Sequence, residues 1–359
     1  NLTGILPESI GMLSALHTLM LTSNVLSGGQ LPSSLFDLQQ LEILHIDFCN
    51  LRGTIPDNIG NLSSLVSFDL NSNDLSGRIP SSICTLYNLQ YLDLSLAQYT
   101  GTIPECIGNL TELNFLNLCN NRLTGTIPDS ISFLNKLTFL SMCLNALYGR
   151  IPESISKLTH IQEIQLDYNY LSGTIPARLF SSGNLTDLEI NNNFLSGTIP
   201  TTLCGLFNLS LVYLFQNNLN GTIPSCINQL SNVVDLMLDS NKLTGTIPAN
   251  MDQMLYLNFL TLNDNMLSGT IPSSLLLLKF ISELSLGHNR FTGYIPAFPP
   301  SFLAFDAEFN MLSGSIPYSL MNNSDVIFIR LIGNKLTGPI PVPFAERENN
   351  VFVGLVYLA

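Results

Sequence analysis

The sequence predicts a repeat solenoid of the α/β class with about 15 turns of 24 residues, and three observations lead to it. Fifteen times, from Pro7 to Pro341, a proline follows a glycine by three positions. Twelve of the fourteen intervals between these prolines are 24 residues, and Leu or Ile directly precedes each proline. A fixed period of this length is typical of turns that bury their apolar faces only against neighbouring turns.

Each repeat is predicted to contain one short strand. Apolar residues lie 12 and 10 positions before the proline, as Phe68 and Leu70 do in one repeat and Ile164 and Leu166 do in another. Apolar side chains at every second position are typical of a strand with one buried face. The intervening positions of the same strand then face away from the core.

An asparagine and a short helical segment complete the repeat. The asparagine stands seven positions before the proline, as at Asn73, and is replaced by Cys49 and Ala97 in two repeats. A buried asparagine can satisfy backbone groups on its own turn and on the next one. Apolar residues three, six and nine positions after the proline, such as Ile59 and Leu62, predict a short helical or 3₁₀ turn on the outer side.

The resulting pattern, LxxLxxLxLxxNxLxGxIPxxLxxL, resembles the plant-type leucine-rich repeats and covers nearly the whole chain. The resemblance implies a right-handed superhelix with a parallel β-sheet on its concave face and short 3₁₀ or helical turns outside. It also implies a second, shorter sheet near the Thr-Gly-Thr-Ile-Pro segments. We expect this solenoid over residues 1–341 and a degenerate last turn over 342–359, where Val351–Leu358 could form a C-terminal strand.

Composition narrows the function classes. The chain is 46% apolar and 11% charged and has a net charge of −13, which argues against binding to nucleic acid. No apolar run approaches the roughly 20 residues that a membrane span needs. Because no phosphate loop, zinc spacing or nucleophile motif occurs, we expect a protein that is not an enzyme, with no catalytic residues, no metal and no cofactor. The chain begins within a repeat at Asn1, so we expect a piece of a longer protein.

The cysteines predict two disulfide bonds between neighbouring turns. In each pair the residues are 22 positions apart, four after one proline and two after the next. The predicted bonds join Cys84 with Cys106 and Cys204 with Cys226. Cys119 and Cys143 occupy equal positions in adjacent repeats, and the sequence leaves open whether they form a third bond or remain thiols. Cys49 is left over and is expected to be buried.

Glycosylation motifs, like the paired cysteines, indicate an extracellular protein. Seven Asn-x-Ser/Thr motifs occur, at Asn1, Asn61, Asn109, Asn184, Asn208, Asn220 and Asn322. Asn61, Asn109 and Asn322 each lie five residues after the proline, on the expected outer surface. We therefore expect N-linked glycans and an extracellular location, either secreted or as a cell-surface ectodomain. A cytosolic solenoid with small buried cysteines is the alternative.

Acidic residues gather at strand positions whose side chains face away from the core. These positions lie 13, 11, 9 and 8 residues before the proline, and 13 of the 26 acidic residues fall on them. They are Asp47, Asp69, Asp93, Glu163, Asp167, Asp187, Glu189, Asp235, Asp239, Asp264, Glu283, Asp306 and Glu308. Arg330 is the only Lys or Arg at these positions. Because a field of one sign steers partners of the opposite sign, we expect a basic partner.

Aromatic side chains stand among these acids on the concave face. The residues expected to contact a ligand there are Tyr91, Phe115, Phe139, Glu163, Asp167, Asp187, Glu189, Tyr213, Phe215, Asp235 and Asp239. Aromatic anchors beside a charged rim are typical of protein or peptide recognition. Alternatively, the acids only keep an apolar rod soluble and the aromatics follow strand propensity. A calcium ion shared by two of the acids is a lesser option, because no calcium loop is present.

The main functional hypothesis is an extracellular recognition module for a protein or peptide, similar to receptor-like proteins, receptor kinase ectodomains or polygalacturonase inhibitors. One alternative is a glycosylated wall or fibre protein whose solenoids stack end to end. A minor alternative is ice binding, because threonine stands two positions before the proline in eight repeats. These threonines are Thr54, Thr102, Thr126, Thr174, Thr198, Thr222, Thr246 and Thr270.

Overall fold

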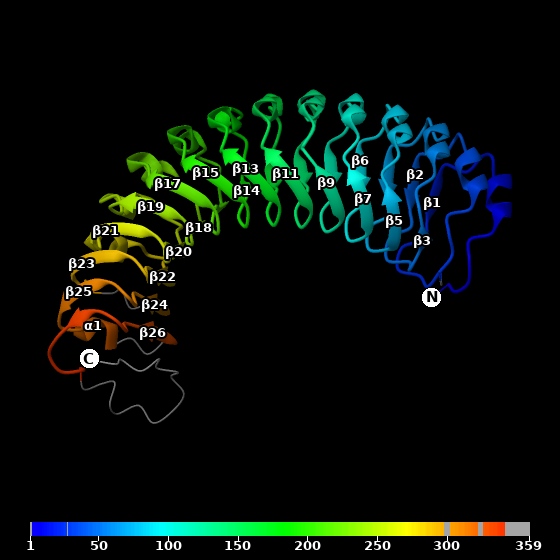
Figure 1. Ribbon diagram of the computed structural model, residues 1–359. Coiled ribbons are helices and arrows are strands. Elements are labelled where there is room, and N and C mark those ends of the chain that lie inside the picture. Colours follow the sequence, from blue (N-terminus) through cyan, green and yellow to red (C-terminus); the bar gives the residue numbers. More distant parts are fainter. Residues whose placement is uncertain (1, 27, 298–301, 322–325, 342–359) are drawn as a thin grey trace. The chain divides into compact units, whose positions relative to one another are not determined.

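The computed structural model describes residues 2–26, 28–297, 302–321 and 326–341. It contains two compact units, Asn1–Leu185 (unit 1) and Thr186–Ala359 (unit 2), and the same repeated plan builds each of them (Figure 1). The tail 342–359, with the strand predicted in Val351–Leu358, lies outside the described residues.

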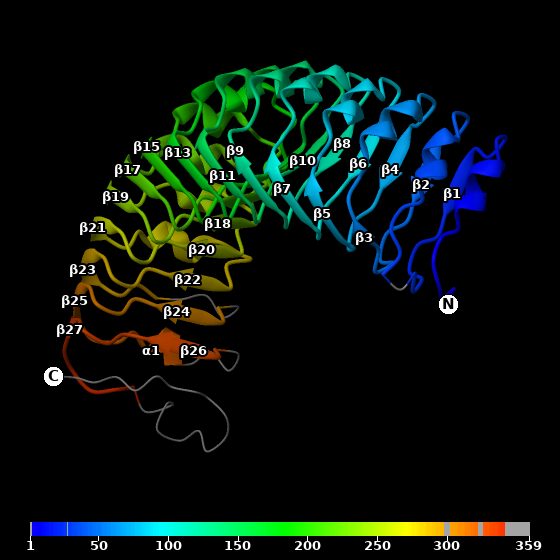
Figure 2. The same cartoon turned by 45° about the vertical axis from the view of Figure 1, so that its right-hand side comes forward.

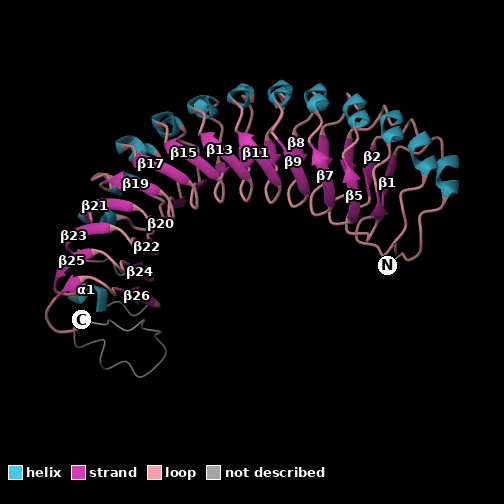
Figure 3. Cartoon of the chain, viewed as in Figure 1, coloured by secondary structure: helices cyan, strands magenta, loops and turns pink. Residues whose placement is uncertain are grey.

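Each turn of unit 1 supplies a strand to a concave sheet, and most supply a second strand to a flanking sheet and a 3₁₀ helix (Figure 3). The concave sheet is parallel and consists of β1 (Thr18–Met20), β2 (Ile43–His45), β4 (Ser67–Asp69), β6 (Tyr91–Asp93), β8 (Phe115–Asn117), β10 (Phe139–Ser141) and β12 (Glu163–Gln165). The flanking sheet consists of β3 (Arg52–Gly53), β5 (Asp74–Arg78), β7 (Gln98–Thr102), β9 (Arg122–Gly125), β11 (Ala146–Arg150) and β13 (Tyr170–Thr174). Figure 2 shows the strands of the two sheets as separate rows.

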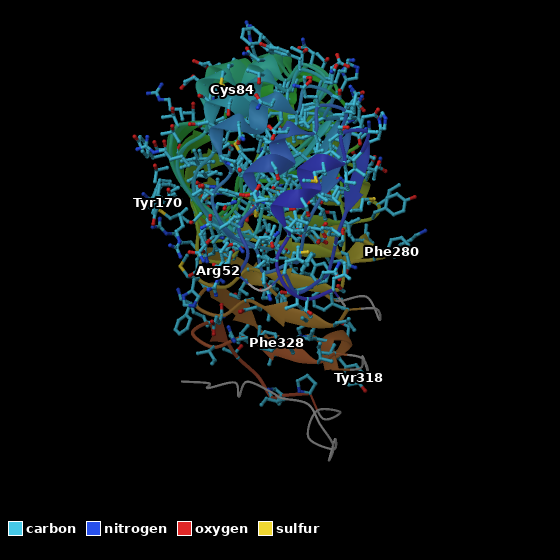
Figure 4. The ribbon with its side chains drawn as sticks, turned by 90° about the vertical axis from the view of Figure 1, so that its right-hand side faces the viewer. Arg52, Cys84, Tyr170, Phe280, Tyr318 and Phe328 are labelled. Atoms are coloured by element: carbon cyan, nitrogen blue, oxygen red, sulfur yellow. A yellow bond between two sulfur atoms is a disulfide. The ribbon has the colours of Figure 1, made fainter. Side chains whose placement is uncertain are left out.

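The 3₁₀ helices of unit 1 lie on the side away from the flanking sheet. In Figure 4, Cys84 lies among the helices, whereas Arg52 and Tyr170 lie on the side of the flanking strands. Each helix begins directly after the proline of its repeat, whose ring fixes φ and so ends the preceding strand. The helices are η1 (Glu8–Met12), η2 (Ser33–Asp37), η3 (Asp57–Asn61), η4 (Ser81–Thr85), η5 (Glu105–Asn109), η6 (Asp129–Phe133), η7 (Glu153–Lys157) and η8 (Ala177–Ser181).

Unit 2 repeats the plan. Its concave sheet consists of β14 (Asp187–Glu189), β16 (Leu211–Tyr213), β18 (Asp235–Met237), β20 (Phe259–Thr261), β22 (Glu283–Ser285), β24 (Ala304–Asp306) and β26 (Phe328–Arg330). Its flanking sheet consists of β15 (Phe194–Thr198), β17 (Asn218–Thr222), β19 (Lys242–Gly245), β21 (Met266–Thr270), β23 (Arg290–Tyr294), β25 (Met311–Gly314) and β27 (Lys335–Leu336). Its helices are η9 (Thr201–Gly205), η10 (Ser225–Gln229), η11 (Met251–Gln253), η12 (Ser273–Leu277) and α1 (Tyr318–Met321).

The register of the concave sheets places equal repeat positions side by side. Leu92 pairs with Leu116, and Leu116 pairs with Leu140, and all three side chains are fully buried. The core of each unit is therefore a stack of equivalent apolar layers, while the alternate strand residues form columns on the open face. The predicted strands, outer 3₁₀ turns and second sheet are confirmed.

The asparagine seven positions before the proline forms the predicted ladder. The side-chain oxygen of Asn121 accepts a hydrogen bond from the Tyr99 backbone N–H at 3.0 Å. Its amide nitrogen donates to the carbonyl oxygens of Leu94 at 2.9 Å and Leu118 at 3.1 Å. Asn145 repeats these contacts one turn later. Each asparagine thus joins two turns through backbone groups that would otherwise be buried without a partner.

Candidate functional site

Three aromatic rings form a continuous stack on the concave sheet of unit 1. Tyr91 pairs with Phe115, and Phe115 pairs with Phe139, in neighbouring strands β6, β8 and β10. Both ring-to-ring centroid distances are 4.4 Å, and the interplanar angles are 9° and 6°. The strand spacing of a parallel sheet, about 4.8 Å, imposes this separation on any aromatic column. The rings are half-buried, so the stack presents an apolar ridge to a partner.

Three carboxylates lie close to the phenol of Tyr91. Asp69 and Asp93 stand directly opposite each other on β4 and β6, and Asp47 follows β2. Asp69 Oδ1 accepts the Asn71 backbone N–H at 3.0 Å. Burial, followed by the charges of Asp93 and Asp47, raises the pKa of the Asp69 carboxyl above its ordinary value. Burial and the charges of all three acids likewise raise the pKa of Tyr91.

These acids are more deeply buried than solvent-facing positions would predict. Asp47 and Asp69 are 8% exposed and Asp93 is 6% exposed, because the strands and side chains of adjacent turns flank them. Asp167 is likewise 8% exposed. The ion pairs His17–Glu42, Arg52–Asp74 and Lys136–Glu112 of unit 1 do not involve these acids. Opposed like charges in a sheet are destabilising, so this arrangement costs the fold stability.

Replacing Asp69 with asparagine is therefore expected to stabilise the protein at pH 7 by up to about 1 kcal/mol. The pKa of the Asp69 carboxyl is higher in the folded protein than in the unfolded chain. The free energy of unfolding therefore falls as the pH rises from the unfolded-state pKa through the folded-state pKa, because ionisation is less favourable in the folded protein. The gain should consequently disappear near pH 4. Urea denaturation of Asp69→Asn at both pH values checks this, with the exposed Asp37→Asn as control. An equal gain at the two pH values would contradict the explanation.

A row at one edge of this face in unit 1 carries four exposed apolar residues and is interrupted by Ser72 and Asn120 at the same repeat position. Phe48, Leu96, Leu144 and Tyr168 are 44–56% exposed. All four have φ between 50° and 53°, the left-handed region that bulky side chains rarely adopt. Each stands eight positions before its proline, so the repeat imposes this conformation. The row turns apolar side chains out to solvent instead of burying them in the core.

Three disulfide bonds are present. Cys84–Cys106 and Cys204–Cys226 match the predicted pairs, and Cys119–Cys143 also forms a bond, which answers the question that the sequence left open. Cys119 and Cys143 follow β8 and β10, so this bond joins the same two turns that carry Phe115 and Phe139. Cys49 is free and buried, as predicted, and burial raises the pKa of its thiol.

The concave sheet of unit 2 carries the other predicted contact residues. Tyr213 lies on β16 and donates its hydroxyl to Asp235 Oδ2 of β18 at 3.0 Å. The Tyr213 and Phe215 ring centroids are 6.2 Å apart. Asp239 accepts the Thr261 hydroxyl at 2.6 Å. The predicted residues therefore form two groups, one in each unit: Tyr91, Phe115, Phe139, Glu163 and Asp167 in unit 1, and Asp187, Glu189, Tyr213, Phe215, Asp235 and Asp239 in unit 2.

Sequence reasoning missed two polar residues of these faces. His45, on β2 of unit 1, contacts the Ser67 hydroxyl through Nε2 at 2.7 Å, and its ring centroid lies 6.1 Å from that of Tyr91. Asn191, which follows β14 in unit 2, is only 3% exposed, and its Oδ1 has no hydrogen-bond partner. The position of each residue in the repeat placed it on the open face, but neither is acidic or a large aromatic.

Arg330, the one basic residue at the open-face positions, is already paired. Its Nη1 donates to Asp306 Oδ2 and to Glu308 Oε1, both at 3.1 Å. Its guanidinium carbon lies 4.9 Å from the ring centroid of Phe328 on the same strand. Arg330 therefore neutralises Asp306 and Glu308 at the C-terminal end of unit 2.

The described part of the chain contains neither a metal-binding group of side chains nor a membrane-spanning helix. Within 2–26, 28–297, 302–321 and 326–341, no group of three or more His, Cys, Asp or Glu side chains could hold a metal ion. In the same ranges no helix is long and apolar enough to cross a membrane. The glycosylation-motif asparagines 61, 109, 184, 208 and 220 are all exposed, whereas Asn1 and Asn322 lie outside the described residues.

Known proteins share this architecture. The Leucine Rich Repeat family model matches residues 40–62, 64–86, 88–110, 112–134 and 184–206. The structure resembles the plant peptide hormone receptor RGFR1 in complex with RGF2, with 35% identity, a TM-score of 0.90, and coverage of 93% of this chain and 54% of that one. It also resembles the LRR ectodomain of the Arabidopsis receptor kinase HAESA in complex with an N-terminally extended IDA peptide hormone. That likeness has 34% identity, a TM-score of 0.89, and coverage of 94% and 57%.

A weaker likeness is to a plant ice-binding protein, with 25% identity, a TM-score of 0.55, and coverage of 83% of this chain and 82% of that one. No curated protein matches the sequence. The chain spans only about half the length of the two receptor structures. The parallel sheets, the 3₁₀ helices and the asparagine ladder define a leucine-rich repeat solenoid. The chain belongs to the plant-type leucine-rich repeat proteins.

Proposed function

We propose that the chain is an extracellular, non-enzymatic recognition module that binds a basic peptide or protein on its concave sheets. The observation that carries the proposal is the half-buried stack of Tyr91, Phe115 and Phe139 beside the carboxylates of Asp69 and Asp93. The likeness to receptors solved with peptide hormones supports a peptide as the ligand.

The chemistry of this face suits a ligand that is both apolar and cationic. The aromatic ridge can anchor an apolar side chain, and the exposed row from Phe48 to Tyr168 can bury more of the ligand. A cation next to Tyr91 would relieve the repulsion between Asp69 and Asp93, which stand opposite each other. Binding would therefore supply the positive charge that this face lacks.

Replacing Phe115 with alanine is expected to weaken such binding by about 2 kcal/mol, close to thirtyfold, because it opens a gap in the middle of the stack. The measurement is titration of the glycosylated, oxidised protein with synthetic peptides that alternate basic and apolar residues. Peptides of the same length with glutamate in place of the basic residues are the ligand control. Phe133→Ala, which removes an exposed ring from η6, is the protein control. If no basic peptide binds more tightly than its acidic counterpart, the proposal is wrong.

The exposed glycosylation motifs support the proposed extracellular location, because glycans could be attached there. Asn61 and Asn109 each end a 3₁₀ helix of unit 1, on the side away from the flanking sheet, where a glycan leaves the concave sheet open. Protein made through a eukaryotic secretory pathway is expected to lose mass on treatment with an N-glycosidase. Asn61→Gln and Asn109→Gln should each remove one glycan from the intact mass. An intact mass equal to that of the bare chain would contradict glycosylation.

Ice binding is a second candidate. Thr198, Thr222 and Thr270 end successive or near strands of the flanking sheet of unit 2, Thr246 directly follows β19, and all four are exposed. The likeness to a plant ice-binding protein supports testing this chain for ice binding. In the neighbouring column, however, the Thr244 hydroxyl donates to the Gly221 carbonyl, so part of the hydroxyl surface is already bonded within the protein. A thermal-hysteresis measurement separates this candidate from peptide recognition.

A further inference from the structure

Three basic residues form a regularly spaced column on the flanking sheet of unit 2. Lys242, Arg290 and Lys335 each stand six positions before the proline of their repeats, on β19, β23 and β27. These are alternate strands in the sheet order β27-β25-β23-β21-β19, which Figure 2 shows as one row. Neighbouring strands lie about 4.8 Å apart, so the charges recur about every 10 Å. Together the three residues are the cation column.

The cation column is exposed and unpaired. All three side chains are exposed, and in the described part of unit 2 none of them forms an ion pair. Met266 and Met311 hold the same repeat position on the intervening strands β21 and β25 and are 37% and 38% exposed. The chain has a net charge of −13, so a line of three unpaired cations runs against its overall charge.

The outward positions of this flanking sheet carry no carboxylate. In the seven repeats of the sheet, the residues six, four and two positions before the proline, and the residue directly after it, include no Asp or Glu. Asp264, which lies two residues before β21, accepts the side-chain amide of Asn263 at 3.0 Å. In unit 1, by contrast, Arg52 of the flanking sheet is paired with Asp74. An anion that approaches the sheet of unit 2 therefore meets positive charge without a competing carboxylate on these positions.

Hydroxyl groups border the cation column. Ser268 stands directly opposite Arg290, and its hydroxyl donates to the Gly245 carbonyl at 3.3 Å. Ser313 stands directly opposite Lys335 and donates in the same way to the preceding turn. A hydroxyl has one proton and two lone pairs, so both serine oxygens can still accept a hydrogen bond from a ligand. The column therefore combines positive charge with acceptors for hydroxyl groups.

We propose that the cation column binds a linear polyuronate, a polysaccharide whose sugar residues carry carboxylates, laid across strands β19 to β27. Arginine and lysine each bind a carboxylate through charge-assisted hydrogen bonds, and the bordering serines accept from sugar hydroxyls. This second site goes beyond the proposed function, which places a peptide on the concave sheets. The three cations extend over four strand spacings, about 19 Å, and so suit a polymer whose charges are widely spaced.

A polyuronate suits this surface better than other polyanions do. An extended peptide gains affinity by pairing with the edge of a sheet or by anchoring large apolar side chains, whereas the column crosses the face of a sheet. Nucleic acid is bound through many cations together with aromatic stacking. A densely sulfated polymer would leave most of its charges unpaired beside a protein of charge −13.

The test is titration of the intact oxidised chain with a galacturonate oligomer long enough to span β19 to β27, in low salt and without calcium. The chain carries Asn220→Gln, because Asn220 belongs to a glycosylation motif and stands directly opposite Lys242. The same oligomer with methyl-esterified carboxylates is the ligand control and should bind at least about tenfold more weakly. Absence of saturable binding, equal binding of the two forms, or equal binding of a glutamate oligomer of the same length overturns the proposal.

Variants locate the site. Lys242→Gln, Arg290→Gln and Lys335→Gln should each weaken binding of the oligomer by about threefold, and together by about twentyfold to thirtyfold. Arg122→Gln is the matched control, because Arg122 holds the same repeat position on β9 but has no cation at that position two turns to either side. It should leave binding nearly unchanged. A loss in Arg122→Gln as large as in Arg290→Gln overturns the proposal.

A rearranged variant separates spacing from charge. Arg290→Met combined with Met311→Arg moves the central cation by one strand and leaves the composition of the chain unchanged. This variant should bind the oligomer about threefold more weakly than the parent, because the moved charge no longer stands midway between Lys242 and Lys335. Binding as tight as that of the parent would mean that net charge alone holds the polymer, which overturns the column as a site.

The outcome for this site can be separated from that for the proposed function. Phe115→Ala changes the concave sheet of unit 1 and should leave binding of the galacturonate oligomer unchanged. The triple variant of the cation column should in turn bind basic peptides as the parent does. Peptide binding without oligomer binding would overturn the column and spare the proposed function. Oligomer binding that depends on the column, without peptide binding, would support the column and overturn the proposed function.

Discussion

Replacing Gly108 with alanine is expected to destabilise unit 1 by about 3 kcal/mol. Gly108 lies in η5, where the chain of the next turn passes directly over it. A Cβ atom at this position would stand 2.2 Å from the Ser130 carbonyl oxygen and 2.9 Å from the Ser130 carbonyl carbon. Backbone atoms cannot rotate away as a side chain can. The Ser130 hydroxyl also donates to the Glu105 carbonyl at 2.6 Å, which ties the two turns together.

The change can be measured by urea denaturation followed by circular dichroism. Gly205→Ala is the matched control, because Gly205 ends η9 of unit 2 and has no heavy atom within 4 Å of an added Cβ. That variant should be as stable as the parent chain or slightly more stable, since alanine restricts the unfolded chain. If the two substitutions lower the free energy of unfolding equally, close contact between turns is not what requires a glycine at position 108.

Replacing Asn121 with alanine is the second change with a large expected effect, also about 3 kcal/mol. The substitution removes the acceptor for the Tyr99 N–H and the donor for the carbonyls of Leu94 and Leu118. These groups belong to two successive turns and are shielded from water, so each lost bond leaves an unsatisfied backbone group. The loss should exceed the cost of any single exposed hydrogen bond.

Asn88→Ala provides the comparison for Asn121. The Asn88 amide also links two turns, by donating to the Ser63 carbonyl at 3.0 Å, but it does so at an exposed site. Water can replace this bond, so a loss of about 0.5 kcal/mol or less is expected. Thermal and urea unfolding of both variants would test the difference. A similar cost for both would show that burial of the ladder is not what makes Asn121 important.

The fold was predictable because a single period controls it. The proline and glycine of each repeat separate the strand from the outer turn, so the positions of the strands, the 3₁₀ helices and the second sheet follow from the spacing alone. The same spacing placed Cys84 beside Cys106 and Cys204 beside Cys226. It could not decide the state of Cys119 and Cys143, because two adjacent cysteines on parallel strands can remain thiols or form a bond.

The candidate site was predictable only as a set of columns. Position within the repeat identified Tyr91, Phe115 and Phe139 as one column, and the register then makes a ring stack unavoidable. The burial of Asp69 and the unpartnered oxygen of Asn191 were not predictable in this way. The burial of Asp69 and the missing partner of Asn191 depend on which side chains occupy the neighbouring turns and how they orient. A repeat pattern gives only the position of each residue in its turn and does not contain that information.

The placement of the disulfide bonds has a mechanical consequence. A solenoid pulled along its axis lengthens by separating adjacent turns, because each turn is held mainly by its neighbours. Cys84–Cys106 and Cys119–Cys143 join successive turns between residues 84 and 143, and Tyr91, Phe115 and Phe139 all fall inside that segment. Under tension the turns outside this segment would separate first, and the aromatic column would keep its spacing. Unit 1 thus holds its ring stack in the part of the chain that resists stretching most.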